Sequence, residues 1–431
     1  MRAFDVILKG LDSFDPDERR ASVEAIVKFG DREGVIEKLI GLLRDKDKGV
    51  RDAVAQSLLS IASDFEGMKK KIVESVCELM CFDDIGLKNL SSELLVKLGE
   101  DAVPSLLSLA NHDDKDIRKM AIDVLGLIGD EKTEDFLIGK LNDPDPNVVV
   151  SVIEALGNVG GGKTVEFLID SFEKFEFAQI QIVESLGKIA ERFHGSEFLK
   201  LIHEFLINLF DQVDDPILKG AIIESLGKVG DKSLVDFLIN LVNDENKAIQ
   251  KMAVISIVKI CSRDGCNFKS NRHFFKFFFQ RAKEIFYNSD DTSFKIDLLK
   301  FLSKWCDFDE VKGFLINVSL TSFDEVSSVA FDIIKSDAEK FISYALNDSS
   351  ITGDKFVKLI GEIFYAKREI LIDLVEEIKN VIAERILSVF DLVSPNEKVL
   401  IFEVLPFLSP DAFAKALPYF QKDPVVRIYL T

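Results

Sequence analysis

The chain is poor in the residues and segments that most enzymes and membrane proteins depend on. Its 431 residues include one Trp, four His and five Cys. No apolar run reaches the roughly 18–20 residues that a membrane span needs, and the densest apolar cluster, Phe274 to Phe279, is far shorter. Asp5 and Lys9 interrupt the start of the chain, which is not typical of a signal peptide. We therefore expect no contact with a membrane.

The scarcity of cysteine and histidine also limits the chemistry. The five cysteines are odd in number and scattered, so we expect no disulfide framework, and free thiols favour a reducing, cytoplasmic location. Cys261, Cys266 and His273 would supply three zinc ligands where a tetrahedral site needs four. No HExxH, nucleophile elbow or Cys/His signature occurs. The sequence therefore predicts no metal, no cofactor and no enzymatic activity.

Positive charge is in short supply as well. The 54 Lys and Arg stand against 74 Asp and Glu, which gives a formal net charge of −20. A nucleic-acid-binding protein relies on clustered Lys and Arg to neutralise phosphates, and the field of this chain repels polyanions. We expect no nucleic-acid partner. Charge complementarity favours a protein partner with a basic segment, bound by a monomer.

What the chain has in quantity is apolar residues arranged in repeats. Apolar side chains make up 47% of the residues, enough for a folded core, although a single core stops growing at roughly 250–300 residues. An apolar marker residue, followed in the best copies by Gly, recurs at intervals of 32, 37, 30, 31, 30, 40 and 31 residues. A period near 31 with variable spacers is typical of a solenoid. The marker residues are Ile26, Leu58, Leu95, Leu125, Leu156, Leu186, Leu226 and Ile257.

Each repeat predicts two helices. In the fourth copy, residues 117–128 have apolar side chains at the i, i+3, i+4 and i+7 spacing of a half-buried helix. Gly129 then stands where a left-handed residue ends a helix. A second helix over residues 133–141 follows, and residues 142–146 break the chain before the next repeat. No segment alternates with period two for long enough to predict a strand, so we predict an all-α fold.

The repeat resembles a known family. The pattern D-P-x-V-R-x-x-A-x-x-A-L-G-x-I-G-D followed by L-I-x-x-L-x-D is similar to the HEAT repeat, in the short form also seen in bilin lyases, from about Asp15 to Ile260. The resemblance implies a right-handed α-α superhelix, and the chain length allows roughly 11–13 antiparallel helix pairs. It implies no reaction, because the family consists mostly of scaffolds and adaptors.

The regularity of the repeats divides the chain into three predicted segments. Residues 1–262 are regular HEAT-like repeats, and residues 291–431 are degenerate repeats that end in a C-terminal cap. Residues 263–290 are irregular and basic, so they are either an insertion or a remodelled repeat.

One segment matches the phosphate-binding loop G-x-x-x-x-G-K-T. It runs from Gly157 to Thr164. That loop needs a strand before it and a helix after it, whereas the residues before Gly157 are in phase with the first helix of every other repeat. Gly157 has equivalents at 126, 187 and 227, which we interpret as repeat turns. We therefore expect no nucleotide binding.

A four-letter motif in the second helices is the candidate binding feature. An acid followed by Phe, Leu and Ile recurs in neighbouring repeats. On a helix at 100° per residue the acid lies opposite the core-facing side chains, so stacked repeats align the acids. By family resemblance the second helices line the concave wall, which predicts an acidic, aromatic-floored groove for a basic segment. The candidate partner-binding residues are Asp135, Phe136, Glu166, Phe167, Asp170, Glu204, Phe205, Asp236 and Phe237.

A plainer interpretation of the motif stays open. The Phe residues would pack between repeats, and the acids would be a solvated surface. The first helices carry a second series, in which Glu184 pairs with Lys188 and Glu224 with Lys228 at i,i+4 spacing. We expect this series to lie on an exposed convex face.

The predicted function is a non-enzymatic scaffold or adaptor that binds a partner protein on its concave face. Stacked helix pairs offer a long surface without the closed pocket that chemistry needs. A bilin-lyase-like or other cofactor-handling protein is one alternative, and it would need a reactive group that the groove does not offer. A nucleic-acid-binding relative, such as the HEAT-like DNA glycosylases, is another, and it would need a basic groove with aromatic residues.

Overall fold

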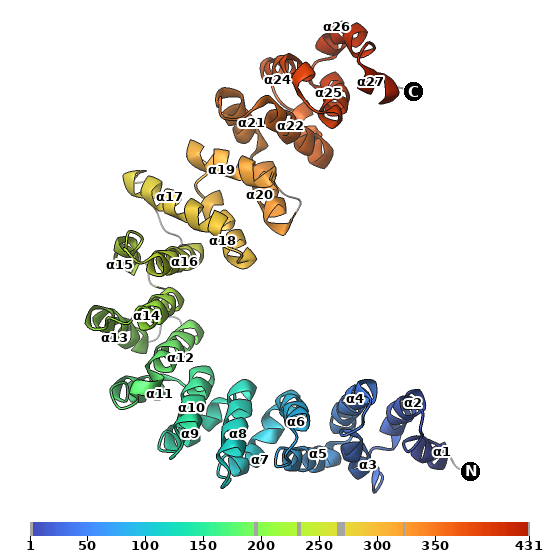
Figure 1. Cartoon of the computed structure of the whole chain (residues 1–431), viewed down its shortest axis with the longest axis vertical. Helices are drawn as coiled ribbons and strands as arrows, with labels where there is room; N and C mark the ends of the chain where they lie inside the picture. The colour runs from blue at the N-terminus through green and yellow to red at the C-terminus, as the bar shows by residue number, and fades with distance from the viewer. Residues whose placement is uncertain (1–2, 194–196, 231–233, 265–271, 322–323, 430–431) are drawn as a thin grey trace. The chain divides into compact units, whose positions relative to one another are not determined.

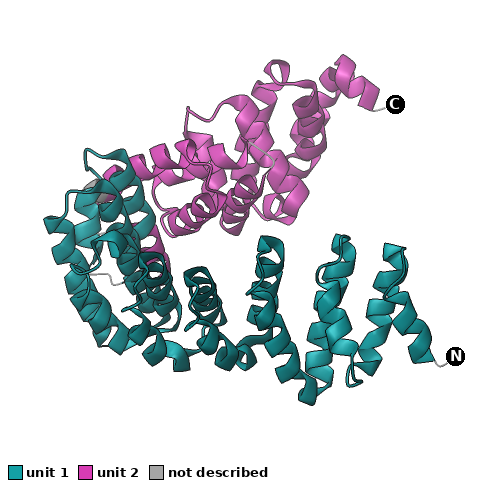
Figure 2. Cartoon of the chain, turned by 60° about the horizontal axis from the view of Figure 1, so that its bottom comes forward, with its two compact units in different colours: residues 1–256 teal, residues 257–431 magenta. Residues whose placement is uncertain are grey.

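The structure, a computed structural model, describes residues 3–193, 197–230, 234–264, 272–321 and 324–429. Every regular element within these ranges is an α- or 3₁₀-helix, which confirms the all-α helical-repeat prediction. Within the described ranges the number of helix pairs lies in the predicted range of 11 to 13. The chain divides into two compact units, residues 1–256 and residues 257–431 (Figure 2). The segment boundaries at residues 262 and 290 stay predictions.

Unit 1 is built of two rows of helices that alternate along the chain. In Figure 1 one row follows the inner side of the arc of this unit and the other row follows its outer side. The inner row contains α2 (Pro16–Ile26), α4 (Lys48–Asp64), α6 (Ile85–Leu98), α8 (Lys115–Ile128), α10 (Pro146–Val159), α12 (Gln179–Arg192), α14 (Pro216–Val229) and α16 (Lys247–Asp264), which continues into unit 2. The outer row contains α1 (Ala3–Gly10), α3 (Val35–Leu42), α5 (Glu66–Leu79), α7 (Val103–Leu109), α9 (Glu134–Lys140), α11 (Gly162–Asp170), α13 (Phe198–Gln212) and α15 (Leu234–Leu241).

Glycine lets neighbouring inner helices touch backbone to backbone. A Cβ atom on Gly126 would lie 2.8 Å from the Cα of Ala155, and one on Gly187 would lie 3.1 Å from the Cα of Ser225. Gly157 and Gly227 meet the following inner helix in the same way. The interpretation of these glycines as turns is therefore wrong, because all of them lie inside helices and serve close packing. Gly129, with φ 75°, does end α8 as predicted.

Serine hydroxyls reinforce these contacts. Ser185 donates to the carbonyl of Ile153 at 2.9 Å, and Ser225 donates to that of Val183 at 2.9 Å. Ser256 and Ser57 make the equivalent bond to Ile223 and Val23. Since these hydroxyls are buried, each bond fixes the register between adjacent inner helices.

Aromatic rings fill the corresponding space in the outer row. Phe205 of α13 meets Phe172, which follows α11, edge to face with centroids 5.4 Å apart. Phe237 of α15 meets Phe210 of α13 in the same geometry at 5.3 Å. Small residues in one row and rings in the other bend this part of unit 1 toward the inner row.

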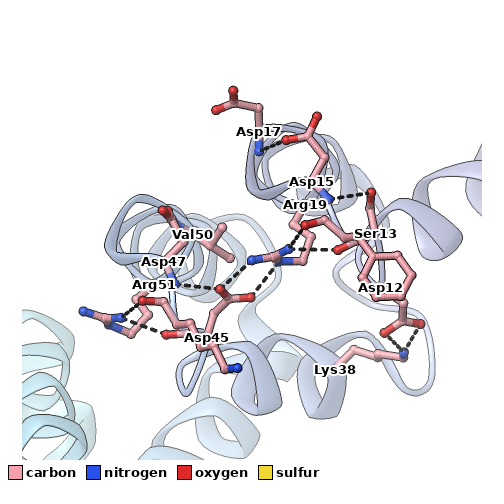
Figure 3. A network of polar contacts seen from close by, with 12 residues as sticks. Asp12, Ser13, Asp15, Asp17, Arg19, Lys38, Asp45, Asp47, Val50 and Arg51 are labelled. Carbon is pink, nitrogen blue, oxygen red and sulfur yellow. Dashed lines mark hydrogen bonds and ion pairs between the residues drawn. The ribbon is translucent and has the colours of Figure 1, made fainter.

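Arginine–aspartate pairs connect successive turns of unit 1. The Nε and Nη2 atoms of Arg19 donate to the Asp45 carboxylate at 2.8 Å each, while its Nη1 atom donates to the carbonyls of Ser13 and Phe14 (Figure 3). Arg118 repeats this geometry with Asp143 at 2.9 Å. Such bidentate bonds are strong, and the one from Arg19 holds the pKa of the Asp45 carboxyl below its ordinary value.

Unit 2 has an aromatic core. Phe275 stacks on Phe308 with ring centroids 4.4 Å apart and also contacts Trp305, and all three are buried. The helices of this unit are α17 (Arg272–Asn288), α18 (Thr292–Ser303), α19 (Asp309–Ser319), α20 (Glu325–Ser336), α21 (Ala338–Asn347), α22 (Gly353–Lys367), α23 (Glu369–Ile372), α24 (Glu376–Ser388), α25 (Pro395–Leu408), α26 (Pro410–Phe420) and α27 (Pro424–Tyr429).

A carboxylate secures the last described helix. Tyr365 of α22 and Tyr429 of α27 both donate to the Glu403 carboxylate of α25. The bond to Glu403, together with burial, raises the pKa of Tyr365 to about 12. These bonds attach α27 to the two neighbouring repeats.

The glycine contact can be tested by adding one methyl group. Gly187→Ala should lower the free energy of unfolding by about 1–3 kcal/mol, because overpacking must force α12 and α14 apart. The control is Gly139→Ala in α9, where a Cβ atom meets nothing within 4 Å and alanine should stabilise the helix by up to about 1 kcal/mol. Urea unfolding of the full chain measures both variants. Equal midpoints for the two would contradict the packing role of Gly187.

Candidate partner-binding site

The structure places the predicted acid–Phe motif in the expected type of helix but on the other side of the unit. The motif lies in α9, α11, α13 and α15, which are all outer-row helices (Figure 1). The expectation that these helices line the concave wall is therefore wrong for unit 1. The helices with glycine at their contacts form the inner row. Glycine allows neighbouring helices to lie closer together, which the inner side of a curved array requires.

The predicted acids are all exposed, but they differ in their partners. Asp135 forms an ion pair with Lys163 of the next repeat, and this bond raises the pKa of Lys163. Within the described residues, no ion pair or hydrogen bond reaches the other four carboxylates. We call these four acids together with Phe167 the acidic stripe: Glu166, Phe167, Asp170, Glu204 and Asp236.

Lysine pairing stops where the acidic stripe begins. From α1 to α11, each outer helix or its flanking turn is joined to the next repeat by an acid and a lysine. The pairs are Asp12–Lys38, Glu37–Lys71, Asp101–Lys69, Glu100–Lys132 and Asp135–Lys163. The stripe on α11, α13 and α15 is therefore a stretch of outer surface whose negative charge has no cross-repeat lysine among the described residues.

The four predicted Phe residues divide between the two interpretations. Phe205 and Phe237 are half-buried and pack against rings of the preceding repeat. Phe136 is half-buried beside Lys140, whose ammonium lies 5.6 Å from the ring centroid. Phe167 is 44% exposed. Packing therefore explains Phe205 and Phe237, while Phe167 offers a ring to solvent next to Glu166.

The segment that resembles a phosphate-binding loop joins two helices. Gly157 lies in α10, and α11 begins at Gly162. The Glu134 carboxylate accepts bonds from the Gly161 N–H at 2.8 Å, the Thr164 N–H at 3.2 Å and the Thr164 hydroxyl at 2.6 Å. The donors that would face a phosphate are thus occupied by a carboxylate of the previous repeat.

The glutamate–lysine series on the first helices lies in the inner row. Glu224 and Lys228 of α14 form the expected i,i+4 pair at 3.1 Å. Glu154 and Glu184 occupy the equivalent positions on α10 and α12 and are exposed. The expectation of a convex face is wrong for this series in unit 1, and a lysine follows the acid by one turn on α12 and α14.

The remaining chemical candidates divide between described and undescribed residues. No group of three His, Cys, Asp or Glu within the described residues is arranged to hold a metal ion, and no described helix is long and apolar enough to cross a membrane. Cys266 and the His273 side chain lie outside the described residues. Cys261 is disulfide-bonded, which differs from the expected free thiol. Burial raises the pKa of the Cys77 thiol to about 12 and the pKa of the Cys306 thiol to about 11. Both thiols are therefore protonated at neutral pH.

Comparisons with known proteins agree with the repeat architecture. A family model of HEAT repeats matches residues 4–74, 103–191 and 204–268. No curated protein sequence matches the chain. Among solved structures the chain is similar to importin beta, with 13% identity, a TM-score of 0.56, and coverage of 98% of this chain and 66% of that one. It is also similar to Kap121p bound to the extreme C-terminus of the phosphatase Cdc14p, with 12% identity, a TM-score of 0.56, and coverage of 98% and 57%.

A third similar structure is Kap121p bound to Ste12p, with 10% identity, a TM-score of 0.51, and coverage of 99% of this chain and 61% of that one. The chain therefore spans between 57% and 66% of the length of these three chains. At such identities the likeness concerns the fold alone.

Glu134 provides a test of the occupied loop. Glu134→Ala should lower the free energy of unfolding by about 1–3 kcal/mol, because it leaves the buried Thr164 hydroxyl without its acceptor. The matched control is Glu166→Ala, an exposed acid whose loss should change stability by less than about 0.5 kcal/mol. Calorimetric titration of the wild type with Mg·ATP should give no binding heat. Mg²⁺-dependent ATP binding that disappears in Lys163→Ala would overturn this assignment.

Proposed function

This chain belongs to the HEAT-repeat family, and we propose that it is a non-enzymatic scaffold that binds a basic segment of a partner protein along the acidic stripe. The observation that carries the proposal is the run of exposed acids on α11, α13 and α15 that no described lysine neutralises. Phe167 adds an exposed ring to the same surface.

The spacing of the stripe favours an extended segment. Neighbouring helices pack about 8–10 Å apart, and a segment in the extended polyproline-II conformation advances about 3.1 Å per residue with three residues per turn, so every third side chain lies on one face. A basic residue at every third position would therefore meet Glu166, Glu204 and Asp236 in turn. The lysine or arginine that meets Glu166 can also lie over the neighbouring Phe167 ring, because cations are attracted to aromatic faces.

The inner row is less suited to a uniformly basic segment. On α12 and α14 the acids Glu184 and Glu224 stand one helical turn before Lys188 and Lys228, so attraction and repulsion alternate on these two helices. Lys200 is an exposed lysine on α13, four residues before Glu204, and it is a single charge against the four acids of the stripe. Electrostatic selection between the two faces therefore favours the stripe.

Charge reversal on the stripe tests the proposal. The probe is a fluorescein-labelled 20-residue peptide with lysine at every third position and leucine and serine elsewhere. Glu166→Lys, Glu204→Lys and Asp236→Lys combined should weaken its binding by well over tenfold at 50 mM salt, because rim charges set the encounter rate and its salt dependence. Fluorescence anisotropy measures the affinity.

A matched triple variant on the inner row is the control. Glu154→Lys, Glu184→Lys and Glu224→Lys change the net charge by the same amount but lie on α10, α12 and α14. This triple variant should weaken binding by less than threefold. A larger loss in the inner-row variant, or equal losses in both, would place the basic segment elsewhere and refute the proposal.

The two kinds of Phe give a second test. Phe167→Ala should weaken peptide binding several-fold and change stability by less than about 1 kcal/mol, because the ring is largely in solvent. Phe205→Ala should lower the free energy of unfolding by about 2 kcal/mol, since it removes the packing against Phe172, with peptide affinity kept. Circular dichroism during urea unfolding and anisotropy separate the two effects. If Phe167→Ala lowered the stability and Phe205→Ala lowered the peptide affinity, the assignment of Phe167 to the acidic stripe would be contradicted.

A further inference from the structure

The turns that lead into several inner helices of unit 1 share a pattern. A side chain two residues before the N-cap residue accepts the backbone N–H of the cap, as Asp45 does for Asp47 at 2.9 Å and Asp143 for Asp145 at 3.1 Å. An arginine four residues after the cap donates through Nη1 to two carbonyls of its own turn. These arginines are Arg19, Arg51 and Arg118.

In two places the arginine of one turn also bonds to the acid of the next turn and so joins one repeat to the next; we call this a complete step. The Nε and Nη2 atoms of Arg19 bind both oxygens of Asp45, and those of Arg118 bind both oxygens of Asp143. The acid in each case stands two residues before the N-cap of the following inner helix. The second edge of each guanidinium is therefore positioned for a carboxylate from the next turn.

The step that starts at Arg51 lacks its acid. Asp84 is the N-cap of α6, so the equivalent position is Phe82, a side chain that cannot accept a hydrogen bond. The Arg51 side chain bonds to the carbonyls of Asp45 at 2.8 Å and Lys46 at 3.1 Å through Nη1 (Figure 3). Its Nε and Nη2 atoms have no acceptor among the described residues.

A cavity lies beside Arg51. It has a volume of about 550 Å³ and is lined by the turn before α4 and by the first turns of α4 and α6, including Arg44, Lys48 and Arg51. The Arg44 guanidinium lies 4.0 Å from the centroid of the Phe82 ring. Arg44 is thus a second cation at the cavity.

The acids that line the cavity do not take the place of the missing one. Asp45 is bound by Arg19, and Asp84 accepts the Leu87 N–H at 3.0 Å. Asp52 and Glu93 also line the cavity, and neither bonds to Arg51 in the structure. None of the four acids that line the cavity therefore bonds to the Nε and Nη2 edge of Arg51.

We propose that this cavity binds a carboxylate of a partner protein, which docks on the Nε and Nη2 edge of Arg51 as Asp45 docks on Arg19. The carboxylate comes from an acidic side chain or from a chain terminus, since both have the same bidentate geometry. The inference is independent of the basic-segment proposal, because it concerns other residues and the opposite charge.

Small carboxylates can test the cavity directly. The full chain is labelled with ¹³C at leucine methyl groups, and the signals of Leu87 and Leu90, which line the cavity, are followed by NMR. The probes are N-acetylglutamic acid α-amide, which carries a side-chain carboxylate, N-acetylglycine, which carries a terminal one, and inorganic phosphate. At least one carboxylate should give saturable shifts, and the tighter of the two identifies the source.

Four variants define the result. Arg51→Gln should weaken the carboxylate at least tenfold, and it should fold normally, because Gln250 makes the equivalent bond to a turn carbonyl, that of Asp244. Phe82→Asp should also weaken it at least tenfold, because the new acid completes the pattern. Phe82→Ala and the exposed control Arg20→Gln should change the affinity by less than threefold.

Three outcomes would overturn the inference. One is the absence of a saturable shift with either carboxylate. Another is binding of phosphate without either carboxylate. The third is a Phe82→Asp variant that binds the carboxylate as tightly as the wild type does. The inserted acid would then not compete with the carboxylate for the Nε and Nη2 edge of Arg51.

Discussion

The close contact between neighbouring inner helices is the constraint on which the rest of unit 1 depends. Gly187 brings the backbone of α12 against Ser225, and the Ser225 hydroxyl then reaches a carbonyl of α12. Such a contact sets both the distance and the register of successive repeats, because a buried hydroxyl has few alternative acceptors. The outer row, held apart by rings such as Phe205 and Phe172, must then follow the longer side of the curve. Curvature, and with it the surface on which the acidic stripe lies, follows from where the small residues are.

The sequence alone predicts the helices, their pairing and the acids that reach solvent, because apolar spacing and breaker residues report local structure. It does not show which row is inner. Both rows have the same half-buried pattern, and Gly126, near the end of α8, is hard to distinguish from Gly129, which ends it. The difference lies in a contact with Ala155 about 30 residues away in the sequence. The sequence predicts the left-handed cap at Gly129, but only the folded chain shows that Gly126 serves packing.

Pairings across repeats were also beyond a single pass along the sequence. Asp135 and Glu166 occupy the same place in the motif, yet only Asp135 meets a lysine of the following repeat. A signal existed, since Lys163 follows Asp135 at nearly one repeat length, as Asp45 follows Arg19. Aligning the repeats on their N-caps exposes both relations and shows Phe82 in an aspartate position. Sequence comparison within the chain could therefore have found the incomplete step at Arg51.

These observations lead to a rule for locating sites in a repetitive chain. When each repeat supplies one member of an ion pair or hydrogen bond to its neighbour, the complete pairs are satisfied within the chain. Such groups have few free donors or acceptors for a partner protein. Glu134 illustrates the satisfied case, because its carboxylate occupies the donors of a loop that otherwise resembles a phosphate site. The acidic stripe and Arg51 illustrate the incomplete case, in which one half of a periodic pair lacks its counterpart among the described residues. Partner-binding sites should therefore occur at such interruptions, because a charged side chain there lacks the counterpart that pairs with it in the other repeats.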